Sequence, residues 1–486
     1  MAAQEEYPHA AGTRVRDPSG GPLLMRSPLE ESVLSRIRPS PEEKEHIRGV
    51  ADRLISVAAG IDRAGPLIVG SVARGTFIRG DRDLDLFLLF EPDLPREELE
   101  REGLALARNI AERMHAPYHE KYAEHPYINA KIDGLDVDLV PCYRVESAAA
   151  IRSAVDRTPF HTRYIEERIG PLTDDVLLLK QFTKAGGVYG SDQMTEGFSG
   201  YLCELLILSC GGFSALLAAA ADWKPGTLID PGGHRTKDFS EPLVVVDPVD
   251  PGRNVSASVS LDRMYEFVEL ARGYQENPSE LFFFPPPEEV LSHAELEAAI
   301  RAKGTSLMAL TFATPPFIAE VVVPQLRRSL DSVCALLERN GFLVNAADCE
   351  MLEDRCMLLF ELVNTETPKV RRHIGPPLWN RSNANRFAEK YRCCGAEGLF
   401  AGPFIENGRY IVEIPRKFTR VDDLLGSADI LEVGLGKHVR QSMSGHWEVH
   451  AGVACWSPAF APFISRFLER KSPLMRILCR TGEAGE

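Results

Sequence analysis

Hydrophobic positions in the first third of the chain change from helical to strand-like spacing. Apolar residues recur every three or four positions between residues 27 and 64, which predicts helices, and Pro39 and Pro41 interrupt the run. Shorter apolar runs then predict a small mixed α/β unit. In chain order, its expected elements are strands at 67–69 and 84–90, a helix at 97–114 and a strand at 137–140.

A strongly helical part follows from residue 171 onward. Apolar residues at 176–179 lie in its first predicted helix, and the Gly186-Gly187 pair ends that helix. Together with the length of 486 residues, these patterns predict an α+β protein of roughly three to four domains. Beyond the proline run at 285–287, the expected elements are strands at 306–312 and 356–363 and a helix at 325–339.

One stretch, from Tyr201 to Ala221, is apolar enough to raise the question of a membrane span. Glu204 lies inside it, and a charge within a bilayer is expensive. The Gly211-Gly212 pair also favours a break between two helices. We therefore expect two buried helices and no membrane partner.

The overall charge does not point to nucleic acid. The chain has 55 Lys and Arg against 70 Asp and Glu, a net charge of -15, and 44% hydrophobic residues, as in an ordinary globular protein. A nucleic-acid binder more often has a basic balance. Phosphate binding needs only a local basic surface, however, so the total does not exclude it.

The cysteines and the N-terminal residues predict where the protein works. Ten cysteines are scattered without a CxxC pair or a histidine at zinc-site spacing, which indicates reduced thiols. Residues 1–26 lack the basic and apolar segments of an export signal and show no periodicity. We expect a flexible N-terminal tail and a cytoplasmic protein.

Two carboxylates at the start of a predicted strand suggest a metal site. Side chains alternate along a strand, so Asp83 and Asp85 project from one face while Leu84 and Leu86 point into the core. Two carboxylates on one face are costly unless a cation neutralises them, and Mg²⁺ prefers oxygen ligands. This pair predicts a magnesium site.

Small residues upstream of the pair predict a phosphate site. A turn at Gly70-Ser71 leaves backbone N–H groups free to approach phosphate oxygens, and the side chains of Ser71 and Arg74 add donors. A triphosphate and a metal would then meet at one place. An Asp-x-Asp pair alone is often a surface turn, so the combination carries the prediction.

A third acid is needed to hold two ions. The strand at 137–140 follows Asp136 and contains Asp138, and either carboxylate fits by spacing alone. Three carboxylates can hold two ions about 3.5–4 Å apart, the arrangement that transfers nucleotidyl groups.

Several ordered blocks of the chain together resemble the archaeal-type CCA-adding enzymes, in the polymerase β-like nucleotidyltransferase superfamily. The resemblance runs from about residue 27 to the C-terminus, and a chance match of so many blocks is implausible. The blocks are GSVARGT, DLDLFLLF, YAEHPY, VDLVPCY, SAVDRTPFHTRY, GFSGYLCELLI, DPVDPGRNVS and GPFIENGRY.

The resemblance implies a reaction and a site. The expected activity is template-independent addition and repair of the tRNA CCA end from CTP and ATP, with two Mg²⁺ ions and release of pyrophosphate. It implies Asp83, Asp85 and Asp138 as catalytic metal ligands and leaves Asp136 structural. It implies these nucleotide contacts: Ser71, Arg74, His161, Lys180, Tyr189 and Arg253, the last reading the base. Lys184, one helical turn after Lys180, is expected to be a solvated side chain.

The resemblance also implies a catalytic head with a mixed sheet, a helical neck, and an α+β body and tail. The acceptor stem and TΨC arm of tRNA would lie along body and tail, and a homodimer is left open. The expected ranges are 27–170 for the head, 171–245 for the nucleotide-binding neck, 246–286 and 408–486 for the body, and 287–407 for the tRNA-binding tail. Basic residues that could meet tRNA phosphates are Arg371, Arg372, Arg386 and Lys390.

Two other functions fit parts of the pattern. A poly(A) polymerase or an oligoadenylate-type enzyme would share the head and differ in its product. A non-catalytic RNA-binding protein could keep the fold, although the intact acids argue against it.

Overall fold

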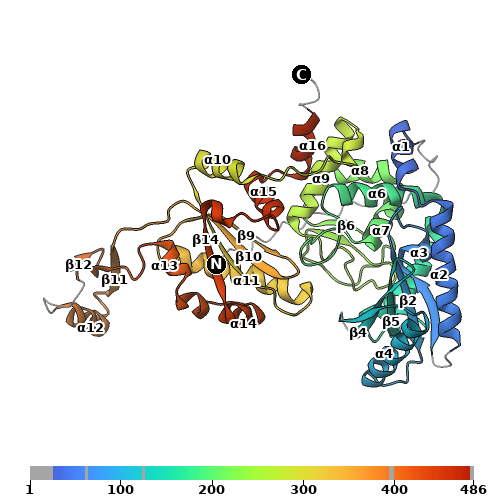
Figure 1. Ribbon diagram of the computed structural model, residues 1–486, viewed down its shortest axis with the longest axis horizontal. Coiled ribbons are helices and arrows are strands. Elements are labelled where there is room, and N and C mark those ends of the chain that lie inside the picture. The colour runs from blue at the N-terminus through green and yellow to red at the C-terminus, as the bar shows by residue number, and fades with distance from the viewer. Residues whose placement is uncertain (1–25, 61–63, 123–125, 393–398, 482–486) are drawn as a thin grey trace. The chain divides into compact units, whose positions relative to one another are not determined.

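The computed structural model describes residues 26–60, 64–122, 126–392 and 399–481, and its chain forms two compact units (Figure 1). Unit 1 contains residues 1–286 and 471–486, and unit 2 contains residues 287–470. The tail expected at residues 1–26 therefore lies almost wholly outside the described residues. Chain segments far apart in sequence complete unit 1.

A five-stranded mixed sheet forms the first part of unit 1. Its order is β1-β2-β5-β4-β3, with β2 and β5 parallel and the other neighbours antiparallel. Apolar residues of α2 and α4 share one core with Leu84, Leu86 and Leu88, so both helices lie on the same face of the sheet (Figure 1). The strands are β1 (Gly65–Val69), β2 (Asp83–Phe90), β3 (Tyr118–Tyr122), β4 (Pro126–Ile132) and β5 (Leu135–Tyr143), and the helices are α2 (Pro41–Ala59), α3 (Gly70–Arg74) and α4 (Arg96–Arg113).

A helical layer forms the second part of unit 1. Its core joins apolar residues from all its long helices, with Phe182 packed among Phe213, Phe267 and Phe282. The α16 helix, near the end of the chain, packs on α9 through Leu474 and Ile477. The elements are α1 (Pro28–Ile37), α5 (Thr158–Ile169), α6 (Thr173–Ala185), α7 (Gly200–Cys210), α8 (Phe213–Ala220), β6 (Thr227–Ile229), β7 (Leu243–Val245), α9 (Leu261–Glu276) and α16 (Pro473–Thr481).

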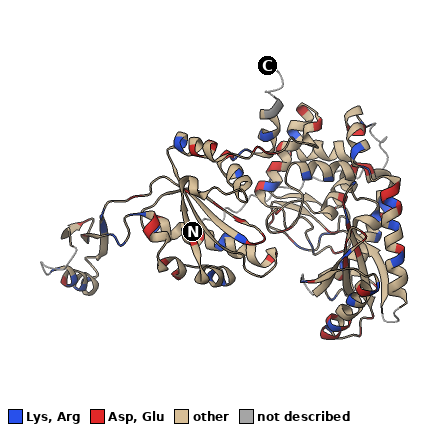
Figure 2. Ribbon diagram, in the orientation of Figure 1, with Lys and Arg blue, Asp and Glu red and all other residues tan. Residues whose placement is uncertain are grey.

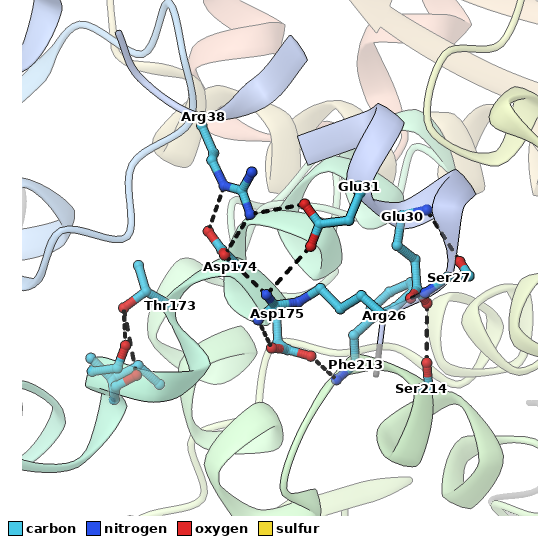
Figure 3. Close-up of polar contacts among 12 residues, drawn as sticks. Arg26, Ser27, Glu30, Glu31, Arg38, Thr173, Asp174, Asp175, Phe213 and Ser214 are labelled. Atoms are coloured by element: carbon cyan, nitrogen blue, oxygen red, sulfur yellow. Dashed lines mark hydrogen bonds and ion pairs between the residues drawn. The ribbon is translucent and has the colours of Figure 1, made fainter. Parts of the chain in front are cut away.

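A polar cluster fixes α1 against this layer (Figure 3). Arg26 donates to Asp174 at 3.1 Å and to Asp175 at 2.8 Å, and Arg38 donates to Asp174 at 2.7 Å. Asp175 also accepts from the backbone N–H of Phe213 at 2.9 Å, the first residue of α8. One carboxylate thus caps α8 and pairs with the segment before α1.

Unit 2 contains two separate antiparallel sheets. The four-stranded sheet has the order β14-β8-β10-β9, and its two faces are covered by separate groups of helices. The three-stranded sheet has the order β11-β13-β12 and carries α12. The strands are β8 (Ser306–Ala313), β9 (Val344–Met351), β10 (Arg355–Leu362), β11 (Val370–Pro377), β12 (Ala401–Glu406), β13 (Arg409–Pro415) and β14 (Trp447–Ala451). The helices are α10 (His293–Lys303), α11 (Ala319–Arg339), α12 (Arg381–Arg392), α13 (Val421–Leu425), α14 (Lys437–Gly445) and α15 (Ala461–Glu469).

The α+β multidomain prediction is confirmed, including the break between α7 and α8. No single helix among the described residues is long and apolar enough to cross a membrane, and the pair α7 and α8 passes that test only together, bent by 92°. One local prediction is wrong: Gly70-Ser71 begins the short helix α3 where a turn was expected. The five residues of α3 are too few for their apolar positions to show a helical period.

Candidate active site

Four acidic residues lie on one face of the head sheet. In the parallel pairing of β2 and β5, Asp83 lies opposite Asp136 and Asp85 lies opposite Asp138. The intervening Leu84, Leu86, Val137 and Leu139 are buried on the other face, as the strand alternation predicted. Asp136 and Asp138, the two candidates for the third acid, therefore both lie beside Asp83 and Asp85.

The two opposed pairs differ in their neighbours. Asp136 forms an ion pair with Lys131 on β4. Asp138 instead accepts a hydrogen bond of 2.6 Å from the side-chain amide of Asn129, which leaves its charge unneutralised. Burial raises the pKa of Asp85 to about 6, and the charges of Asp138 and Asp83 add to the shift. The pKa of Asp83 is also raised, by burial and by three neighbouring acids.

These carboxylates have the chemistry of a divalent-cation site. Burial first, and the neighbouring acids second, disfavour the ionised forms of Asp83 and Asp85, and a bound cation would offset both effects. Among the described residues, no three Asp, Glu, His or Cys side chains are already drawn together closely enough to hold a metal ion. The carboxylate oxygens of Asp83, Asp85 and Asp138 are the kind of ligand that a hard divalent cation prefers.

The backbone at Gly70 approaches the acid face closely. Gly70 has φ = +76°, and a Cβ there would lie 2.1 Å from Oδ2 of Asp85. Ser71 follows in α3, and Val69 pairs with Asp85 in the sheet. Only glycine fits this position, because a side chain would displace the Asp85 carboxylate.

Two predicted phosphate contacts belong to one buried cluster around Glu204. The guanidinium of Arg74 lies 2.9 Å from Oε2 of Glu204, and the Glu204 side chain is fully buried. Lys180 is 2% exposed, donates to the backbone oxygen of Thr76 at 2.8 Å and lies 4.0 Å from Glu204. Thr76 donates its hydroxyl to Glu204 as well. Burial lowers the pKa of Lys180, against the opposing charge of Glu204.

Tyr189 and Lys184 lie beside this cluster. The hydroxyl of Tyr189 is close enough to Gly200 that a Cβ there would meet it at 3.1 Å and the Lys180 ammonium at 3.6 Å. Lys184 lies over the Tyr189 ring at 5.2 Å and donates to Asp81 at 2.8 Å. Lys184 is thus the more solvent-exposed lysine, as expected, but it is paired.

The remaining predicted contacts, His161 and Arg253, meet at Asp247. Nε2 of His161 and Nη1 of Arg253 each lie 2.9 Å from Oδ2 of Asp247, which is fully buried. The Arg253 side chain also lines a cavity of about 600 Å³ together with Arg157, Ser199 and Lys237. These two contacts and the acid face come from different elements of unit 1.

The predicted tRNA contacts lie in the three-stranded part of unit 2. Arg371, Arg372, Arg386 and Lys390 are all exposed, on β11 and α12, and Figure 2 shows the basic residues of α12. Burial lowers the pKa of His373, and the nearby charges of Arg371 and Lys390 add to the shift. Trp379, 79% exposed, follows β11.

Sequence reasoning missed the two buried carboxylates that organise these contacts. Glu204 was singled out only as an obstacle to a membrane span, and Asp247 only as part of a matching block. A lone acid in the apolar run of α7 is the signal that could have identified Glu204, because a buried charge needs a partner. No comparable signal distinguishes Asp247 from Asp250 in DPVDP.

The mixed sheet, its paired acids and the adjoining buried cations define a nucleotidyltransferase. Residues 63–161 match the nucleotidyltransferase domain, residues 174–284 the second domain of tRNA nucleotidyltransferase, and residues 303–452 the C-terminal domain of the CCA-adding enzyme. The chain is 61% identical over 453 residues to the CCA-adding enzyme of Methanoregula boonei, covering 93% of this chain and 98% of that one. The chain belongs to the family of CCA-adding enzymes.

More distant relatives show the same family. The CCA-adding enzyme of Methanosarcina barkeri is 42% identical, covering 87% of this chain and 94% of its own. The CCA-adding enzyme of Haloarcula marismortui is 40% identical, over 90% of this chain and 97% of its own length. A solved structure of the Cid1 poly(U) polymerase covers 52% of this chain and 96% of its own at 18% identity and a TM-score of 0.41, too low to support any statement on function.

Proposed function

We propose that the protein completes and repairs the 3'-terminal CCA of tRNA, with Asp83, Asp85 and Asp138 holding two Mg²⁺ ions. Membership of the family of CCA-adding enzymes supports this reaction. In it, the RNA 3'-hydroxyl attacks the α-phosphorus of CTP or ATP, a phosphodiester forms and pyrophosphate leaves. The poly(A) polymerase and non-catalytic alternatives are not favoured by the relatives. Divalent metal use is general for such enzymes, and magnesium and the number of ions are our proposal.

The single observation that carries the metal assignment is the register of β2 and β5. It places Asp85 opposite Asp138, whereas Asp136 is paired with Lys131. The spacing of the sequence left Asp136 and Asp138 open, and their different neighbours support Asp138. When bound, two ions would activate the attacking hydroxyl and neutralise charge on the leaving pyrophosphate.

The nucleotide contacts proposed are Ser71, Arg74, His161, Lys180, Tyr189 and Arg253. Arg74 and Lys180 both lie against the single buried carboxylate Glu204, and the N–H donors of Arg74 suit the oxygens of a triphosphate. Arg253, lining the cavity, is proposed to meet the base. His161 contributes a ring fixed by Asp247.

We propose that unit 2 supplies the tRNA contacts. The acceptor stem and TΨC arm are proposed to lie against the β11-β13-β12 sheet and α12, which fall mostly within the predicted tail. Exposed Arg371, Arg372, Arg386 and Lys390 support this placement, because phosphate contacts need accessible cations.

We also propose the division into head, neck, body and tail, and a cytoplasmic location. Segment 246–286, expected in the body, lies in unit 1, and β14 from the expected body pairs with β8 from the expected tail. We propose the cytoplasm as the location, since eight cysteines of the described residues are unpaired. If the protein is a homodimer, its measured mass in solution will be twice that of one chain.

The test of the function is incorporation of labelled CTP and ATP, with Mg²⁺, into tRNA transcripts that lack the last three nucleotides. Sequenced products should gain C, C and A in order and then stop. An A-only tail would instead indicate a polymerase, and no incorporation would indicate a binding protein.

The test of the metal site is Asp85→Ala. We expect incorporation to fall by at least about a thousandfold while tRNA affinity stays within about twofold, because metal and phosphate contacts are separate. Asp136→Asn is the matched control, on the same face but paired with Lys131, and should retain activity within about fivefold. Full activity of Asp85→Ala would exclude the metal assignment.

A further inference from the structure

Asp247 is a buried carboxylate that gathers four donors from three segments of unit 1. Its Oδ2 accepts from His161 on α5 and from Arg253, each at 2.9 Å. Its Oδ1 accepts from the hydroxyl of Tyr201 on α7 at 3.2 Å and from the backbone N–H of Val249 at 3.0 Å. An ionised carboxylate only accepts, so Nε2 of His161 carries the proton. All four donors are therefore oriented by one group.

The ring of His161 is held on its flat side too. It stacks on Tyr201 with ring centroids 4.1 Å apart and planes inclined by 23°. Burial alone would raise the pKa of Asp247, but hydrogen bonding and charge from His161, together with Arg253, lower it to about 2. The carboxylate thus stays ionised at any working pH and holds its donors continuously.

Arg253 connects this buried group to the cavity. Its side chain is 37% exposed and lines the cavity of about 600 Å³, while Asp247 has no exposure. A guanidinium is planar and has five N–H donors, so fixing Nη1 fixes the plane in which the others point. Of the four groups that donate to Asp247, Arg253 lines the cavity, so Asp247 can act on a ligand there by holding the Arg253 guanidinium.

A fixed N–H donor discriminates between bases. Cytosine N3 and adenine N1 are acceptors on the Watson–Crick edge, whereas uracil N3 and guanine N1 carry hydrogens. A protein N–H held opposite that atom can donate to C or A. Opposite U or G, the protein N–H would meet the N–H of the base, and two hydrogens would be opposed. A donor free to rotate loses that preference.

We propose that Asp247 is a positioning residue for nucleotide selection, which holds Arg253 and His161 in the arrangement that admits C and A and rejects U and G. This rests on the proposed function of Arg253 as the base contact. Asp247 itself does not touch the nucleotide.

The experiment measures kcat/KM for CTP and UTP on tRNA lacking CCA, and for ATP and GTP on tRNA ending in CC. Asp247→Asn keeps the shape but loses the charge, and we expect both C:U and A:G discrimination to fall by about tenfold or more. A merely structural role would lower all four values together and leave the ratios unchanged, which would overturn the proposal. Asp238→Asn, at an exposed pair with Arg235, is the control and should change neither ratio.

Two further variants keep the proposal decidable. Tyr201→Phe removes one donor and should lower discrimination by about twofold to threefold, so it decides the matter if Asp247→Asn does not fold. Arg253→Ala tests the proposed base contact separately from the positioning role of Asp247. If Arg253→Ala leaves both ratios unchanged, the proposed base contact fails. If it relaxes selection and Asp247→Asn does not, only the role of Asp247 fails.

Discussion

Two predicted nucleotide contacts, Arg74 and Lys180, depend on the same residue for their charge environment. Glu204 is fully buried between the Arg74 guanidinium and the Lys180 ammonium, and it also accepts from Thr76. Without it, two cations would remain in a site with little solvent. Breaking a buried pair in this way is costly, because the remaining charge has no compensation.

We predict that Glu204→Gln lowers the free energy of unfolding by about 3 kcal/mol, measured by urea denaturation. The matched control is Glu100→Gln, which removes a solvent-exposed pair with Arg96 one helical turn away and should cost less than about 1 kcal/mol. Equal losses in both variants would mean that the buried cluster contributes nothing special to stability.

Helix α8 shows how one side chain determines where an element begins. The backbone N–H of Phe213 has no partner within its own helix turn and donates to Asp175 on α6 at 2.9 Å. The same carboxylate pairs with Arg26 (Figure 3). The start of α8 and the segment before α1 are thus fixed to α6 together.

We predict that Asp175→Ala destabilises the protein by about 1–2 kcal/mol, since both the cap and the ion pair are lost. Hydrogen exchange should show faster exchange in α8 and α1 than in the head sheet. As a control, Glu167→Ala removes only an exposed pair with Arg168 and should leave those rates unchanged. Unchanged protection of α8 in Asp175→Ala would contradict the capping role.

At the level of elements, strong periodicity was predictable and side-chain partners were not. The alternation predicted that Asp83 and Asp85 share one face of the strand while Leu84 and Leu86 are buried on the other. The Gly211-Gly212 pair predicted the break before α8. The short helix α3 was missed, because five residues contain too few apolar positions to show a period. Asp247 was missed because two of its partners, His161 and Tyr201, lie 86 and 46 residues away in sequence.

At the scale of the whole molecule, a net charge of -15 coexists with a local basic surface on β11 and α12. Binding of RNA through that surface releases counterions, so affinity should fall with salt despite the acidic total. The pKa of His373, lowered by burial and by Arg371 and Lys390, is consistent with a positive potential there.

We predict that Arg371→Gln weakens tRNA binding and reduces the slope of log affinity against log salt by about one, as loss of a single phosphate contact would. Filter binding over a range of KCl concentrations measures both. Arg301→Gln, at an exposed pair with Glu297 on α10, serves as the control and should keep the slope. A slope unchanged by Arg371→Gln would remove this residue from the tRNA surface.

The order of the chain through its two units has a consequence for synthesis. Unit 1 ends at residue 286 and resumes at residue 471, and Leu474 and Ile477 of α16 belong to its core. A ribosome makes the chain from its N-terminus, so the nascent catalytic unit lacks part of its core until the whole of unit 2 and α16 have been added. Any product of premature termination would carry the acid face on an unfinished scaffold. The catalytic unit can therefore complete its core only after unit 2 has been synthesised.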